Sequence, residues 1–136
     1  MKVEIVDFKP EHFDQMDMRD YEAEFKDDLL VLYKASVESK TAFVDGEIYS
    51  TWGIIKEDDG HYFWQVPSKI LSANTMIYAR RAFFVIRKMV KNYENAYTFC
   101  RDDELHENWM KFIGFKPNHN MKFEDNGKNY LMYEAV

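Results

Sequence analysis

The spacing of apolar residues along this 136-residue chain changes period several times, and each change marks an element. Alternating apolar and charged residues predict a strand over residues 2–7, and Pro10 then favours the start of a helix. From about residue 20 to residue 39 the apolar residues follow one helical face, which predicts a second helix. A third, longer helix is predicted over about residues 74–93, and its inner face carries Ala79, Phe83, Ile86 and Val90.

Three Asx-Gly pairs lie between runs of β-branched and aromatic residues, at Asp45-Gly46, Asp59-Gly60 and Asn126-Gly127. An Asx-Gly pair in this setting is the strongest local signal for a β-hairpin, because both residues tolerate a positive φ. The pairs therefore predict a mostly antiparallel sheet. The expected strand pairs are 41–44 with 47–56, 47–56 with 61–66, and 121–124 with 129–134.

A further strand over residues 96–100 follows the long helix, so strand, helix and strand predict a parallel crossover. The complete order is one strand, two helices, three strands, a helix, a strand, a helix and two strands. This order predicts a single α+β domain over residues 1–136. It should have a mixed, mostly antiparallel sheet of six to seven strands, flanked by about four helices.

A short helix is expected after residue 101, ending in a glycine turn. Either Asp102 or Asp103 can cap its first turn, and Gly114 suits the left-handed position that follows a helix. The apolar residues of this segment recur at helical spacing, at Leu105, Trp109 and Phe112.

The charge and the amino-acid composition of the chain argue against several classes of function. The formal net charge of −6 and a pI near 5.2 argue against uniform binding to nucleic acid, although residues 61–93 carry six bases and no acid. One cysteine, Cys100, excludes a disulfide framework and is expected to be a small buried apolar residue. No apolar run reaches the roughly 18 residues of a membrane span, and no signal peptide opens the sequence. The four histidines share no metal-ligand spacing, so no metal site is expected.

The segment ending in Gly114-Phe115 resembles the RxFYExxGF signature of the GCN5-related N-acetyltransferases (GNAT), and the order of elements resembles their fold. The resemblance implies acetyl-CoA as donor and a tyrosine four residues before the glycine, where this chain has Met110. Because a thioether cannot donate a proton, Met110 is expected to have a core role. The catalytic candidates on the fourth strand are His61 and Gln65.

The GNAT resemblance also implies a glycine-rich turn for the coenzyme pyrophosphate at the start of the long helix. No glycine occurs between Gly60 and Gly114, and Pro67 removes one backbone donor. A modified anion site and a solvated basic helix face both remain open. The cofactor-binding candidates are Val66, Ser68, Ser72, Ala73, Asn74, Arg80 and Arg81.

A closer resemblance rests on the aromatic strand 63–68, the basic helix and residues 106–115, which are similar to small GNAT-like internal virion proteins of podophages. It implies a structural or morphogenetic protein of the virion or host cytoplasm that acts by binding a protein partner, with no cofactor. The alternative is an active acetyl-CoA-dependent N-acetyltransferase acting on a host or phage amine. A third possibility is a host-directed protein that blocks a partner.

Overall fold

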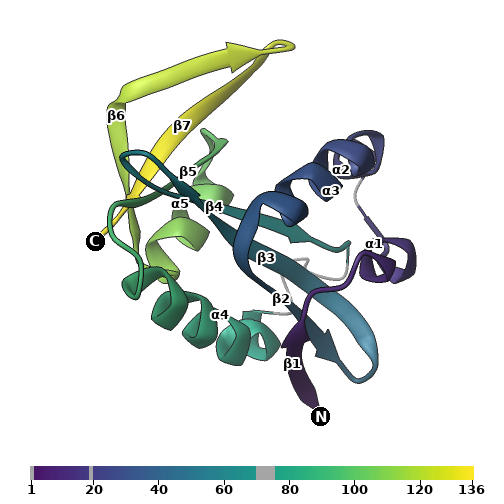
Figure 1. The fold of residues 1–136 in the computed structure, drawn as a ribbon. Coiled ribbons are helices and arrows are strands. Elements are labelled where there is room, and N and C mark those ends of the chain that lie inside the picture. The colour runs from purple at the N-terminus through teal and green to yellow at the C-terminus, as the bar shows by residue number, and fades with distance from the viewer. Residues whose placement is uncertain (1, 19, 70–75) are drawn as a thin grey trace. The chain divides into compact units, whose positions relative to one another are not determined.

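The computed structural model describes residues 2–18, 20–69 and 76–136. This part of the chain forms seven strands and five helices (Figure 1). In chain order they are β1 (Val3–Asp7), α1 (Glu11–Gln15), α2 (Asp20–Glu24), α3 (Lys26–Ala35), β2 (Ser36–Val44), β3 (Glu47–Glu57), β4 (Gly60–Pro67), α4 (Met76–Lys91), β5 (Ala96–Arg101), α5 (Glu104–Phe112), β6 (Phe115–Asp125) and β7 (Lys128–Ala135).

The strands form one mixed sheet in the order β1-β2-β3-β4-β5-β7-β6. Only β4 and β5 run parallel among the pairs described below, so the prediction of a mostly antiparallel α+β sheet is confirmed. The chain divides into two units, Met1–Lys56 with Trp64–Ala82, and Glu57–Phe63 with Phe83–Val136.

In the first unit, β2 pairs antiparallel with β1 on one side and with β3 on the other. The turn between β2 and β3 has positive φ at both Asp45 and Gly46, as the Asx-Gly pair predicts. Seven consecutive residues of β3, from Ile48 to Ile54, are buried, which is expected of a central strand covered on both faces.

Aromatic rings fill the core of this unit. The ring of Phe8 lies 4.6 Å from Tyr33, 4.8 Å from Phe13 and 6.0 Å from Trp64, between ring centroids. The indole Nε1 of Trp64 donates a hydrogen bond of 2.7 Å to the Ser36 hydroxyl. These contacts join α1, α3, β2 and the second half of β4.

The predicted helix over residues 20–39 is wrong at its end. The helical segment divides into α2 and α3, and α3 stops at Ala35. Ser36 is already extended, pairs with Ile55 of β3, and uses its hydroxyl to bond the carbonyl oxygen of Leu32. Because β3 is 11 residues long, its backbone offers partners to residues 36–39, and pairing with them outweighs the continued helical pattern.

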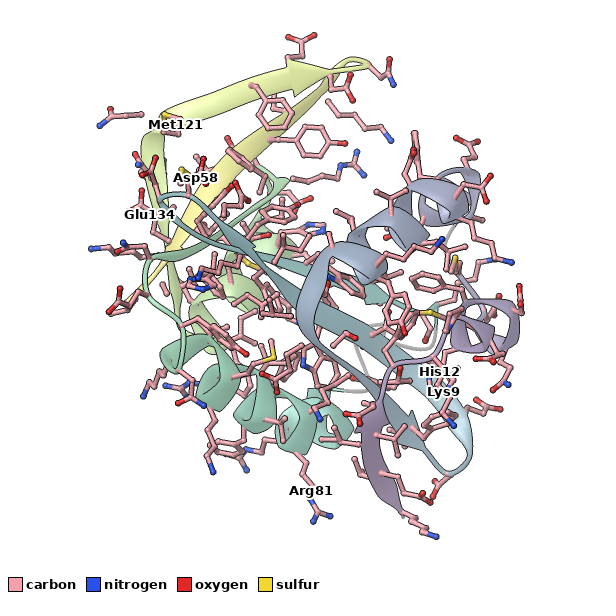
Figure 2. The ribbon with its side chains drawn as sticks, viewed as in Figure 1. Lys9, His12, Asp58, Arg81, Met121 and Glu134 are labelled. Atoms are coloured by element: carbon pink, nitrogen blue, oxygen red, sulfur yellow. The ribbon has the colours of Figure 1, made fainter. Side chains whose placement is uncertain are left out.

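In the second unit, β7 pairs antiparallel with both β5 and β6. The register skips residues 119–121 of β6, where Figure 1 shows the strand turning a corner and Figure 2 places Met121. The predicted strand 121–124 was therefore too short, because β6 already begins at Phe115, whereas the predicted strand 129–134 is close to β7. The turn itself has positive φ at Asn126 and Gly127, as predicted.

Helices α4 and α5 contact each other in this unit through Phe83, whose ring lies 4.9 Å from Phe112 and 5.9 Å from Trp109. Asp103 caps α5 by accepting a 2.8 Å hydrogen bond from the backbone N–H of His106. Gly114 has φ +100°, so the predicted left-handed turn after this helix is confirmed.

Candidate functional site

The most distinctive backbone feature of the second unit is the short parallel contact between β4 and β5. It consists of two residue pairs, His61 with Ala96 and Tyr62 with Tyr97. The next residues of the two strands, Phe63 and Thr98, are not paired with each other. Strands that part in this way leave backbone N–H and C=O groups available to a ligand.

Tyr62 lies at the last of these pairs. Burial raises the pKa of its phenol, and a hydrogen bond with Thr98 only partly offsets this effect. The ring lies 5.5 Å from that of Tyr97, between centroids. Tyr62 is therefore a protonated hydroxyl at neutral pH. The pattern of apolar and polar residues along β4 does not distinguish Tyr62 from its neighbours. The sequence therefore did not predict Tyr62 as a functional residue.

The neighbouring Tyr97 is engaged within the same unit. Its hydroxyl donates a 2.7 Å hydrogen bond to Glu57 Oε1, and burial followed by this carboxylate raises the pKa of Tyr97 to about 12. The hydroxyl of Tyr97 is therefore held by Glu57, the last residue of β3.

The predicted catalytic candidate His61 is the second residue of β4. Its Nδ1 lies 2.6 Å from the carbonyl oxygen of Glu94, which can only accept, so Nδ1 carries the proton. The imidazole also lies 5.0 Å from the ring of Tyr93. This tautomer leaves the Nε2 lone pair as the basic atom of His61.

Gln65, the other catalytic candidate, belongs to the first unit. Its side-chain amide donates to the Ser50 hydroxyl at 3.1 Å. A neutral amide cannot take up a proton at neutral pH, so Gln65 can donate or accept a hydrogen bond but cannot act as a general base.

Among the cofactor-binding candidates, Val66 and Ser68 are both buried, with 1% and 2% of their surface exposed. The Ser68 N–H donates to the carbonyl oxygen of Tyr49 at 3.0 Å, and its hydroxyl has no hydrogen-bond partner among the described residues. Arg80 and Arg81 are exposed on α4, and Figure 2 shows Arg81 projecting away from the helix. Ser72, Ala73 and Asn74 lie outside the described residues.

Two further predictions concern the core. Met110 is 5% exposed on α5, in agreement with its expected packing role. Cys100, expected to be a small buried apolar residue, is half-buried. Burial, with the charges of Asp103 and Asp102, raises the pKa of Cys100 to about 12, so at neutral pH it is a thiol.

No three His, Cys, Asp or Glu side chains within residues 2–18, 20–69 and 76–136 lie close enough together to hold a metal ion. Over the same residues, no helix has the length and apolar character needed to cross a membrane.

Comparison of the structure with solved structures gives matches along almost the whole chain. An IAA acetyltransferase from Bacillus cereus has a TM-score of 0.65 and 8% identity, covering 98% of this chain and 99% of that protein. Ard1 from Thermoplasma volcanium has a TM-score of 0.68 and 12% identity, covering 98% of both. The chain has a GNAT fold.

A third neighbour of this GNAT fold was solved with its donor. It is a GNAT family acetyltransferase from Elizabethkingia anophelis with acetyl-CoA bound, with a TM-score of 0.61 and 13% identity, covering 98% of this chain and 97% of that protein. No family model matches the sequence, and no curated protein matches it. At sequence identities of 8–13%, the similarity to these solved structures shows the fold alone.

Proposed function

We propose that this GNAT-fold protein is an acetyl-CoA-dependent N-acetyltransferase. The observation that carries the proposal is the end of the β4–β5 pairing at Tyr62 and Tyr97, in a fold that matches acetyltransferases over 98% of the chain. One of those neighbours holds acetyl-CoA, which supports the same donor here. The natural acceptor is an amine, of the host or of a phage.

Acetyl transfer to an amine forms a C–N bond and breaks the C–S bond of the thioester. The amine must lose a proton, and the departing sulfur must gain one. Met110 cannot supply that proton, because its side chain is a thioether. Tyr62 is a phenol at the last residue pair of β4 and β5, and it carries its proton at neutral pH. We assign it as the acid.

For the base, His61 remains the candidate, since hydrogen bonding at Nδ1 leaves Nε2 free to accept a proton. Val66, Ser68, Ser72, Ala73, Asn74, Arg80 and Arg81 remain the proposed donor-binding residues. The Ser68 hydroxyl, which has no partner within residues 2–18, 20–69 and 76–136, supports this set, because a buried hydroxyl without a partner costs about 1–3 kcal/mol unless a ligand or water satisfies it.

The first test is binding. Acetyl-CoA should raise the melting temperature of the protein, and Arg80→Ala with Arg81→Ala should reduce the shift. CoA release should then be followed with a panel of primary amines. Tyr62→Phe should lower the rate of release by roughly a hundredfold, the usual range for loss of a general acid. Tyr130→Phe, which also removes a phenol from the second unit, is the matched control.

The second candidate is a structural or morphogenetic role in a phage virion, through binding of a protein partner. Its support is the buried Met110, which fills the place of the missing acid, together with the glycine-free stretch from residue 61 to residue 113. If acetyl-CoA neither binds nor releases CoA, this candidate takes precedence. Mass spectrometry of purified particles and assembly intermediates then tests it.

A further inference from the structure

A hollow of about 380 Å³ in the second unit lies beside the last two turns of α4. The turn at Gly114 and the end of β7 complete its wall. Apolar side chains and two cationic side chains line it together, and they include Val90, Ile113, Ala135, Arg87 and Lys91.

The position of Arg87 depends on Gly114. A Cβ built on Gly114 would lie 3.9 Å from both Cγ and Nε of Arg87, so the arginine side chain runs along the glycine turn. The turn is fixed in place because the Gly114 carbonyl oxygen accepts a 2.9 Å hydrogen bond from the Val136 N–H. Arg87 is half-buried, and its aliphatic stem packs against a defined surface.

Lys91 follows Arg87 by four residues, so both cations lie on one face of the helix. Neither side chain makes an ion pair or a hydrogen bond to another described residue, and no Asp or Glu side chain from the described segments lines the hollow. The unit pairs other bases, such as Lys111 with Glu107 at 3.2 Å. Arg87 and Lys91 are thus two like charges with no Asp or Glu side chain beside them in the hollow.

The helix dipole does not account for this arrangement by itself. A cation in the last turn of a helix is stabilised by the helix dipole. This stabilisation also acts on a fully exposed cation, so it does not explain why Arg87 is half-buried in a hollow. Lys88, also near the end of α4, supplies such a cation from an exposed position outside the hollow. A guanidinium held beside an apolar wall, with a second cation one turn away, requires another explanation.

We propose that the Arg87–Lys91 hollow binds the phosphate group of a small molecule. A guanidinium can donate two parallel hydrogen bonds to phosphate oxygens, and an ammonium adds a compact point charge. The apolar wall made by Val90 and Ile113 reduces competition from water for these charges. The proposal is independent of acetyl transfer, since none of these residues belongs to the predicted donor or acid-base set.

The test uses inorganic pyrophosphate as the probe, titrated by calorimetry into the full chain at constant ionic strength. Arg87→Met keeps the length of the stem but removes the charge, and should weaken binding by about tenfold, the usual loss for a charge-assisted hydrogen bond. Lys88→Met removes the same charge from the same helix outside the hollow, and should leave the affinity within about twofold. Lys91→Gln, at an exposed position that does not endanger folding, should weaken binding several-fold.

Equal losses for Arg87→Met and Lys88→Met would overturn the proposal, because they would show a general effect of net charge. Absence of saturable binding at millimolar pyrophosphate would overturn it as well. Acetyl-CoA binding, measured on the same Arg87→Met protein, should be unchanged. Failure of the phosphate site is therefore distinguishable from failure of the acetyltransferase proposal.

Discussion

The indole of Trp64 occupies the space that a side chain at position 53 would need. A Cβ on Gly53 would lie 2.5 Å from Nε1 of Trp64 and within 2.7 Å of two carbons of the same ring. The ring cannot retreat easily, because its Nε1 is bonded to Ser36 and its edge contacts Phe8.

Gly53→Ala should therefore lower the free energy of unfolding by about 1–3 kcal/mol or more, as expected for overpacking of a rigid core. Urea denaturation checks the value. Gly46→Ala is the matched control: Gly46 has open space around its Cβ position, so only its φ of +84° opposes alanine, at a cost of roughly 1–2 kcal/mol. If Gly53→Ala lowers the free energy of unfolding less than Gly46→Ala does, Trp64 does not pack closely on β3.

The sequence predicted the structure correctly where only neighbouring residues determine the backbone conformation. The Asx-Gly turns at Asp45 and Asn126, the cap at Asp103 and the glycine turn at Gly114 all follow from short-range backbone preferences, and the structure has each of them. Asp59-Gly60 also joins two strands, but Gly60 is needed for a different reason. A Cβ there would lie 2.6 Å from the carbonyl oxygen of Asn95, a contact made by a distant segment.

The remaining differences come from contacts that no local pattern contains. The helix predicted over residues 20–39 ends early because β3 recruits residues from Ser36 onward into the sheet. Tyr62 is notable only because β4 and β5 part beside it, and Arg87 only because Gly114 comes close. These are relationships between segments far apart in sequence, so the fold could be predicted better than the candidate sites.

His12 should make stability depend on pH. Its Nδ1 accepts hydrogen bonds from the Lys9 N–H at 3.1 Å and from the Thr41 hydroxyl at 2.8 Å, which requires the neutral ring. Figure 2 shows His12 and Lys9 side by side. Burial lowers the pKa of His12, the charge of Lys9 acts in the same direction, and Glu11 opposes both.

Because the folded pKa lies below the ordinary value of about 6.5, the unfolded chain binds the proton more tightly. The stabilising contribution of neutral His12 is therefore complete above about pH 6.5 and is lost as the pH falls through the folded pKa. Urea denaturation at pH 7.5 and pH 5.5 should show this loss, which by pH 5.5 amounts to at most about 1.4 kcal/mol, the value of one pH unit below 6.5. His12→Asn should flatten the dependence, whereas His119→Asn, at an exposed position, should leave it intact. An equal pH dependence in wild type and His12→Asn would contradict the assignment.

Cys100 should be nearly inert to alkylation in the folded protein. The thiolate is the reactive form, and a pKa of about 12 leaves roughly a thousandfold less of it at pH 8 than the ordinary pKa of about 8.5 would. Iodoacetamide labelling, followed by intact mass, should thus be slow in buffer and fast in urea, where burial and the fixed charges of Asp102 and Asp103 no longer act. The double variant Asp102→Asn with Asp103→Asn tests the second cause separately: removing the nearby charges should increase the folded-state rate while burial still keeps it below the rate in urea. Rapid labelling of the native protein would instead identify Cys100 as an activated thiol, and it would then have to be considered as a nucleophile.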